Sequence, residues 1–151
     1  MMKTTIPVVR LKMVREKSVP YGTGTAIADP LDCIRYLKPL FEGEYREKVI
    51  VLGLDSSNHV TVIHVVGLGG VGSCPADVGC VLKAMLVSNS AAGILAHNHP
   101  SGNLVVSEAD WMVTERVRKG MAAVGLQLLD HVIVDGECRD SLSMRGLGRW
   151  A

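Results

Sequence analysis

Two histidines and one aspartate have the types and spacing of a metal site. His97 and His99 lie two residues apart in the segment AHNHPSG. In an extended segment, side chains at positions i and i+2 project from the same face, so both imidazoles can converge on one point. Asp110 follows in the first turn of an expected helix, and a loop containing Gly102 can fold that turn back over the strand end. Two imidazoles and a carboxylate are typical of zinc with an open fourth position, so we expect one Zn²⁺ per chain.

Hydrolysis at such a site also needs a proton acceptor and a hydrogen-bond donor. Zinc lowers the pKa of a bound water to about 7 and polarises a carbonyl group. Three carboxylates lie upstream, at Glu42, Glu44 and Glu47. Glu47 is the predicted general base because it directly precedes an expected strand, and Glu44 is the alternative. Ser107, at the start of the expected helix, is predicted to donate to the oxyanion of a tetrahedral intermediate.

These residues resemble the JAMM motif of MPN/JAB-domain metalloproteases, in which a glutamate precedes His-x-His, a serine and an aspartate. The segment HNHPSG, the pair Arg46-Glu47, Thr114 and the segment LDHVIV at 129–134 more narrowly resemble the RadC family of bacterial JAB domains. The resemblance implies zinc bound by the two histidines and the aspartate. It also implies the glutamate as general base, the serine beside the oxyanion, and hydrolysis of a peptide or isopeptide bond.

The resemblance covers about residues 45–136, and we expect one domain over residues 1–151. Two departures stand out: Val-Ser at 106–107 replaces the usual Pro-Ser, and Pro-Ala-Asp at 75–77 replaces a His-Pro-Arg-Glu run. Neither departure removes a predicted ligand. We expect no helix-hairpin-helix domain of the kind that precedes the JAB domain in longer RadC-like proteins, which weakens the connection with DNA.

Several alternatives remain open at this stage. Ser107 and Asp110 also fit the Ser-x-x-Asp pattern of a helix capping box. We predict that Asp110 ligates zinc, since it cannot serve both purposes equally well. His131 is equally consistent with a residue behind the ligands and with a core histidine. For the whole chain, the expected partner is a peptide or protein substrate; the alternatives are a non-catalytic metal-binding scaffold and a DNA repair or recombination factor.

Alternating helices and strands are expected to position these residues. The pattern predicts strands at 5–16, 48–54, 59–66, 93–96 and 126–134, and helices at about 30–42, 75–89 and 107–125. Asp29-Pro30 is an N-cap followed by proline at the first helical position. The turn residues at 55–58 make the second and third strands a hairpin. The predicted fold class is α/β, a single layered domain with a mixed β-sheet flanked by helices, as in JAB/MPN and cytidine-deaminase-like proteins.

Composition excludes several classes of protein. The chain has 151 residues, of which 48% are hydrophobic and 21% charged, so it is not a disordered chain. A net charge of +1 gives little electrostatic affinity for nucleic acid. No apolar run has the 18 or so residues of a membrane span, and Arg10 and Lys12 interrupt the N-terminal segment, which excludes a signal peptide. We therefore expect a cytoplasmic protein without a membrane partner; the sequence does not indicate an oligomeric state.

The cysteines agree with that compartment. Cys33, Cys74, Cys80 and Cys138 show no CxxC spacing, and a chain of this length does not need disulfides to stabilise its core. We predict free, buried thiols. A zinc ribbon would need paired cysteines, so the predicted zinc belongs to the histidine and aspartate set alone.

Overall fold

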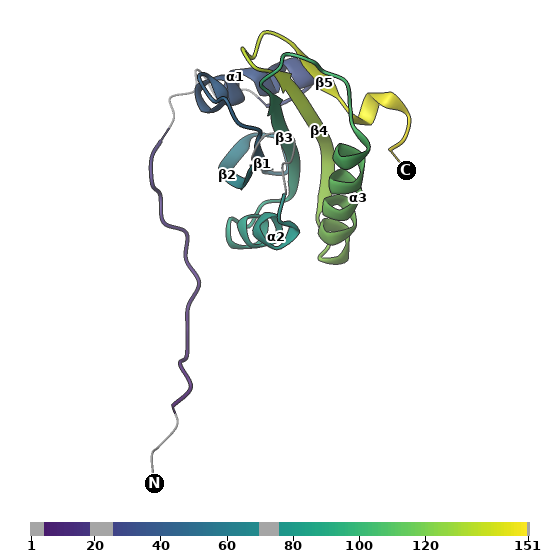
Figure 1. Cartoon of the computed structure of the whole chain (residues 1–151). Coiled ribbons are helices and arrows are strands. Elements are labelled where there is room, and N and C mark those ends of the chain that lie inside the picture. The colour runs from purple at the N-terminus through teal and green to yellow at the C-terminus, as the bar shows by residue number, and fades with distance from the viewer. Residues whose placement is uncertain (1–4, 19–25, 70–75, 151) are drawn as a thin grey trace.

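The computed structural model describes residues 5–18, 26–69 and 76–150 and shows a five-stranded sheet with three helices (Figure 1). The elements in chain order are α1 (Pro30–Phe41), β1 (Lys48–Leu54), β2 (Val60–Leu68), α2 (Val78–Val87), β3 (Ala92–His99), α3 (Glu108–Ala123), β4 (Gln127–Asp135), β5 (Ser141–Ser143) and a 3₁₀ turn (Arg145–Leu147). Within the described ranges, no helix combines the length and the apolar character needed to cross a bilayer.

The sheet is mixed, as predicted. Its strand order is β2-β1-β3-β4-β5. β1 runs antiparallel to both β2 and β3, β3 runs parallel to β4, and β5 returns antiparallel to β4. The parallel pair needs a long crossover connection, which α3 supplies. The predicted fold class and the predicted hairpin at residues 48–66 are therefore confirmed.

Helices cover both faces of the sheet (Figure 1). Side chains of a strand alternate between faces. On β1, Ile50 and Leu52 pack in the core cluster that contains α1, whereas Val49 and Val51 pack in the cluster that contains α2 and α3. The central strand β3 follows the same alternation, with Leu95 in the cluster of α2 and α3. Odd-numbered positions of β3 therefore face the two later helices, which decides where its histidines point.

One predicted strand and the start of one predicted helix differ from the structure. The predicted strand at 5–16 is wrong, because residues 5–18 form neither strand nor helix. Its apolar side chains are each at least 55% exposed, among them Ile6, Leu11 and Met13. The pattern alternates as a strand would, yet within the described ranges no strand pairs with it. The helix expected to open at Pro75, which lies outside the described residues, begins at Val78 after an Asp77 cap whose carboxylate accepts from the Gly79 amide.

The thiols are free where the structure describes them, at Cys33, Cys80 and Cys138; Cys74 lies outside the described residues. Cys33 and Cys138 are buried, as predicted, but Cys80 is half-buried. Burial raises the pKa of the Cys33 thiol to about 12 and that of Cys138 to about 11. Both buried thiols therefore remain protonated and unreactive in the folded protein.

Candidate metal centre

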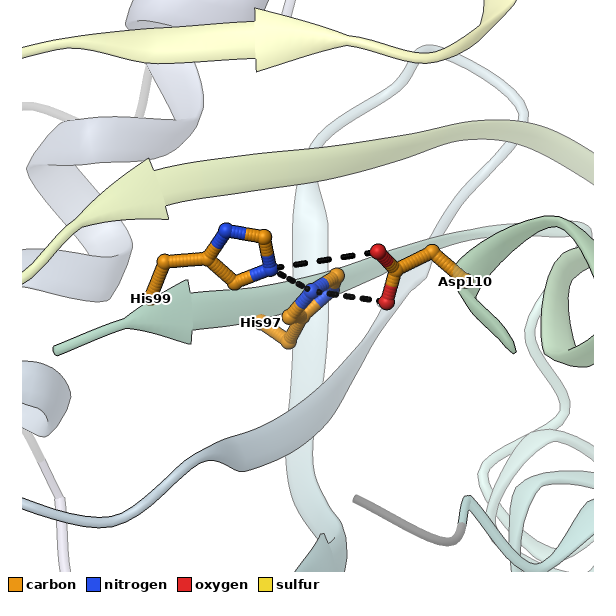
Figure 2. A group of neighbouring side chains, drawn as sticks. All are labelled: His97, His99 and Asp110. Carbon is orange, nitrogen blue, oxygen red and sulfur yellow. Dashed lines mark hydrogen bonds and ion pairs between the residues drawn. The ribbon is translucent and has the colours of Figure 1, made fainter. Parts of the chain in front are cut away.

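The end of β3 and the start of α3 bring the three predicted ligands together. The sequence predicted a strand ending at Ala96, but β3 continues to His99. The extension places His97 and His99 on the face that packs against α3, two residues apart. Asp110 lies in the first turn of α3, and Figure 2 shows the three side chains pointing toward one another.

The distances are those of a compact group. The Nε2 atom of His97 lies 2.8 Å from Nε2 of His99 and 3.2 Å from Oδ1 of Asp110 (Figure 2). Nε2 of His99 lies 3.9 Å from Oδ2 of Asp110. One ligand atom from each residue falls within 4.8 Å of the others. Because His97 is buried and the other two are only partly exposed, these three side chains could hold a metal ion in a site with limited access to water.

The chemistry of this donor set fits a divalent metal. The Nδ1 atom of His99 lies 2.5 Å from the backbone carbonyl of Asn103. A carbonyl oxygen only accepts, so the ring carries a hydrogen on Nδ1 and, when neutral, presents the Nε2 lone pair to the group. Burial raises the pKa of Asp110, but hydrogen bonds with His97 and Ser107 outweigh it and hold the pKa well below its usual value. The carboxylate is thus ionised, and one potential ligand atom from each residue converges on a point where a cation would be stabilised.

Asp110 caps its helix and faces the histidines at the same time. The Ser107 hydroxyl accepts from the Asp110 amide at 3.1 Å and donates to Asp110 Oδ2 at 2.7 Å, and the Ser107 amide donates to the same oxygen at 2.7 Å. The other oxygen, Oδ1, faces His97. Asp110 thus completes the capping box while its carboxylate faces both histidines, so the geometry forces no choice between capping and the predicted metal binding. The predicted role of Ser107 beside an oxyanion stays a prediction.

Glu47 lies on the same face as the histidines. Val49 of β1 pairs directly with His97 of β3. Glu47 precedes Val49 by two residues, so strand alternation places it on the face of the proposed ligands. Its side chain is half-buried, and its backbone carbonyl accepts from the Gly69 amide at 2.7 Å. The structure therefore places Glu47 directly before β1, near the strand pair that contains His97; its catalytic role stays a prediction.

Glu44, the alternative base, is engaged in ion pairs. One carboxylate oxygen lies 3.0 Å from the Lys48 ammonium, and the other lies 3.4 Å from the Arg46 guanidinium. Hydrogen bonding from Lys48, the largest contribution, lowers the pKa of Glu44. A carboxylate stabilised in its charged form by two cations is a weaker proton acceptor.

Asn98 anchors the segment that carries Glu47. Its side-chain amide donates to the carbonyl of Arg46 at 3.0 Å and accepts from the amide of Lys48 at 2.8 Å. The two contacts span the residue between them, which is Glu47. Asn98 is completely buried. The sequence indicated only a structural residue here, because the partners lie about 50 positions away along the chain.

His131 lies directly behind the ligands. Its Nε2 atom is 2.8 Å from Nδ1 of His97, and its Nδ1 atom is 2.6 Å from the hydroxyl oxygen of Thr114. The ring is buried, and burial, the largest contribution, lowers its pKa well below the usual value. The two interpretations left open by the sequence are therefore both correct, since His131 is a core residue that contacts a proposed ligand.

A groove adjoins the centre. It has a volume of about 580 Å³ and is lined by residues 103–106, Trp111, Leu142, Leu147 and Arg149. It meets the centre at two places: the Asn103 carbonyl bonds to His99, and Trp111 follows Asp110 directly. The Arg149 guanidinium lies 4.6 Å from the centre of the Trp111 ring. The groove thus offers apolar walls and a guanidinium that is ion-paired with Glu108 at 2.7 Å.

The chain resembles proteins of diverse microorganisms. It is 38% identical to a UPF0758 protein of Acidithiobacillus ferrooxidans over 137 residues, 90% of this chain and 60% of that protein. It is 38% identical to a UPF0758 protein of Pseudoalteromonas translucida over 112 residues, 74% of this chain and 50% of that protein. A UPF0758 protein of Methanosarcina acetivorans is 34% identical over 123 residues, 82% of this chain and 54% of that protein. The chain therefore spans between 50% and 60% of the length of these relatives.

The family comparison covers the sheet, its helices and the centre. Residues 27–149 match the RadC-like JAB domain. This range contains every residue of the candidate metal centre, from Glu47 to His131. The resemblance inferred from the HNHPSG segment is confirmed, and the chain belongs to the RadC family of JAB domains.

Proposed function

We propose that this protein is a zinc-dependent hydrolase that cleaves a peptide or isopeptide bond. The observation that carries the proposal is the convergence of His97, His99 and Asp110 on one point. Glu47 lies two residues before Val49, the strand partner of His97. Two histidines and one carboxylate are a ligand set that zinc enzymes use, and this set leaves a coordination position open. Membership of a JAB family supports the same reaction class.

In the proposed reaction, zinc would supply the polarisation and Glu47 the proton transfer. When bound, zinc polarises the substrate carbonyl and lowers the pKa of water. Glu47 accepts the proton of the attacking water as that water forms a bond to the carbonyl carbon. The protonated Glu47 then passes the proton to the leaving nitrogen as the carbon–nitrogen bond breaks, so the carboxylate returns to its starting state.

Two further contacts support these assignments. Glu44 is a weaker candidate for the base, because Lys48 and Arg46 stabilise its charged form. Ser107 holds Asp110 through its hydroxyl and its amide, which restricts the carboxylate to the orientation shown in Figure 2. Rotation of the Ser107 hydroxyl hydrogen away from Asp110 would let it donate to a developing oxyanion.

The groove supports a polypeptide substrate. Its walls carry exposed apolar side chains, including Val105 and Leu147, which are 70% and 48% exposed. An extended chain with an apolar side chain close to the scissile bond would bury these surfaces and reach the centre at Asn103. Since the relatives are longer than this chain, the substrate of a whole protein of this family is a proposal as well.

The test separates metal binding from catalysis. We expect purified protein to hold about one zinc ion per chain by atomic spectroscopy, and His97→Ala or Asp110→Ala to abolish that occupancy. Glu47→Gln removes the proton acceptor but no ligand, so it should retain zinc and lose cleavage of a peptide and isopeptide library read by mass spectrometry. The matched control is Glu16→Gln, which changes an exposed carboxylate in the N-terminal segment and should retain both.

Two results would contradict the proposal. Full zinc occupancy in either ligand variant would show that other residues hold the metal. Unchanged cleavage by Glu47→Gln would assign the base to another residue. If the wild-type chain binds zinc at this group but cleaves no member of a broad library, the alternative of a non-catalytic metal-binding scaffold replaces the hydrolase.

A further inference from the structure

A buried chain of hydrogen bonds leads from α3 to the proposed ligand His97. The Thr114 hydroxyl oxygen lies 2.6 Å from the backbone carbonyl oxygen of Asp110 and 2.6 Å from Nδ1 of His131. On the other side of that ring, Nε2 of His131 lies 2.8 Å from Nδ1 of His97. The side chains of Thr114, His131 and His97 are all buried, with His131 only 1% exposed. Water therefore cannot exchange readily with any of these contacts.

The Asp110 carbonyl fixes the direction in which these hydrogen bonds donate. The Asp110 carbonyl only accepts, so the single hydrogen of the Thr114 hydroxyl lies on that 2.6 Å contact. The hydroxyl oxygen must then accept from His131, which places a hydrogen on His131 Nδ1. The other ring nitrogen, Nε2, is then the acceptor of the neutral imidazole, and it lies 2.8 Å from Nδ1 of His97.

The same direction of donation decides which nitrogen of His97 carries a hydrogen. Because His131 Nε2 can only accept, His97 must carry its hydrogen on Nδ1. Nε2 of His97, which faces His99 and Asp110, is then the nitrogen whose lone pair a metal can use when the ion replaces the hydrogen bond to Asp110. A neutral imidazole without such a partner can hold its hydrogen on either nitrogen, and only one of the two tautomers presents a lone pair to a metal.

We propose that Thr114 and His131 are positioning residues that fix the tautomer of His97 and so prepare its Nε2 atom for metal binding. This inference rests on the metal site of the proposed function. Histidines that bind metals usually donate their second N–H to a carboxylate, a carbonyl or a water. Here the acceptor is a second imidazole, whose own tautomer depends on one threonine hydroxyl. That threonine lies one helical turn after Asp110, so α3 supplies one ligand and orients another.

The tautomers can be read without metal or substrate. Long-range ¹H–¹⁵N correlation spectra of the histidine rings, recorded on metal-free protein, report which ring nitrogens carry hydrogen. In the wild type we expect hydrogen on Nδ1 of both His97 and His131 and none on Nε2 of His131. Thr114→Val removes the hydroxyl at nearly constant volume and should give a mixture of both His131 tautomers, whereas Thr114→Ser keeps the hydroxyl and should restore the wild-type pattern.

Zinc affinity provides the second measurement. Competition with a chromophoric chelator should show binding weakened by about 10- to 100-fold in Thr114→Val, and near wild-type binding in Thr114→Ser. The matched control is Thr61→Val, which removes a hydroxyl that donates to the Gly53 carbonyl at 3.1 Å; Thr61 lies on the edge strand β2, two strands away from β3. This control should alter neither the ring spectra nor the affinity.

The outcomes distinguish this inference from the proposed function. Hydrogen on Nε2 of His131 in the wild type would overturn the inference, and this result does not depend on how well the variant folds. An unchanged tautomer pattern in Thr114→Val would also overturn it, even if zinc binds well. Conversely, the expected tautomers together with a failure of the wild type to bind zinc would refute the proposed metal site while leaving the hydrogen-bond direction intact. Equal loss of affinity in Thr61→Val would assign the effect to general destabilisation and overturn the inference.

Discussion

Asn98 lies between two proposed ligands, and its side-chain amide hydrogen-bonds to the backbone at the start of β1. Strand alternation places it on the opposite face from His97 and His99. Its two hydrogen bonds, to the Arg46 carbonyl and the Lys48 amide, hold the residues on both sides of Glu47. One short segment of β3 therefore supplies metal ligands on one face and positions the predicted base through the other.

Asn98→Ala should loosen the segment that carries Glu47. The substitution leaves the Lys48 amide and the Arg46 carbonyl without their bonds to a buried side chain, which costs about 1–3 kcal/mol in the free energy of unfolding. We expect the Lys48 amide to exchange with solvent faster than the change in global stability explains, measured by hydrogen–deuterium exchange with urea unfolding. Gln127→Ala, which truncates an exposed amide side chain at the start of β4, is the control and should change neither measurement. Unchanged protection at Lys48 would contradict the anchoring role.

Two helices of this domain begin with the same type of capping box, but only one of them contains a proposed ligand. At α1, Asp29 and Asp32 exchange hydrogen bonds between side chain and backbone. At α3, Ser107 and Asp110 do the same. The pair offers an internal comparison, because capping alone stabilises each helix whereas the α3 box also orients a carboxylate toward His97.

Ser107→Ala and Asp29→Ala should therefore differ in one property. Each substitution removes an N-cap and should lower the free energy of unfolding by about 0.5–2 kcal/mol, measured by urea titration. Only Ser107→Ala should also weaken zinc binding, because Asp110 loses the hydroxyl that fixes Oδ2. Ser107→Thr retains the hydroxyl and should retain affinity. If Asp29→Ala reduced zinc affinity as much as Ser107→Ala, the effect would come from stability and not from orientation of Asp110.

The sequence predicted the elements better than it predicted their ends and partners. The spacing of His97, His99 and Asp110 was sufficient to bring the ligands together, because strand alternation and the first turn of a helix are local geometry. The strand limit at Ala96 was too short, since polar residues ended the apolar run. In the structure, the buried His97 and Asn98 are satisfied by His131 and by the backbone of β1, which are distant in sequence.

The strand at 5–16 was predicted although it has no partner strand among the described residues. Its alternation is genuine, but a β-strand is stabilised only when a neighbour accepts and donates backbone hydrogen bonds. Residues 5–18 remain exposed, and local pattern alone cannot reveal whether a partner strand exists. The short strand β5 was missed because three residues, Ser141–Ser143, give no measurable period. Long-range pairing thus sets the limit of what this sequence could predict.

At the scale of the whole molecule, the centre connects the sheet to a helix. His97 and His99 belong to β3, Asp110 belongs to α3, and the loop between them closes against His99 through Asn103. Unfolding separates these side chains, so a metal that binds them must favour the folded state. Stability and metal binding are therefore linked, and each can be used to measure the other.

Zinc should raise the melting temperature of the wild type and not that of His99→Ala. At a free zinc concentration of about 100 times Kd, linkage adds about 2.7 kcal/mol to the free energy of unfolding. For a domain of this size, that corresponds to a rise of about 5–10 °C in Tm, followed by circular dichroism across a zinc series. His99→Ala controls for zinc bound by the cysteines of the unfolded chain, which would lower Tm in both proteins. Equal shifts in Tm in the two proteins would show that zinc binds elsewhere. If zinc binds at the group that joins β3 to α3, the stabilisation by zinc must depend on the His99 imidazole.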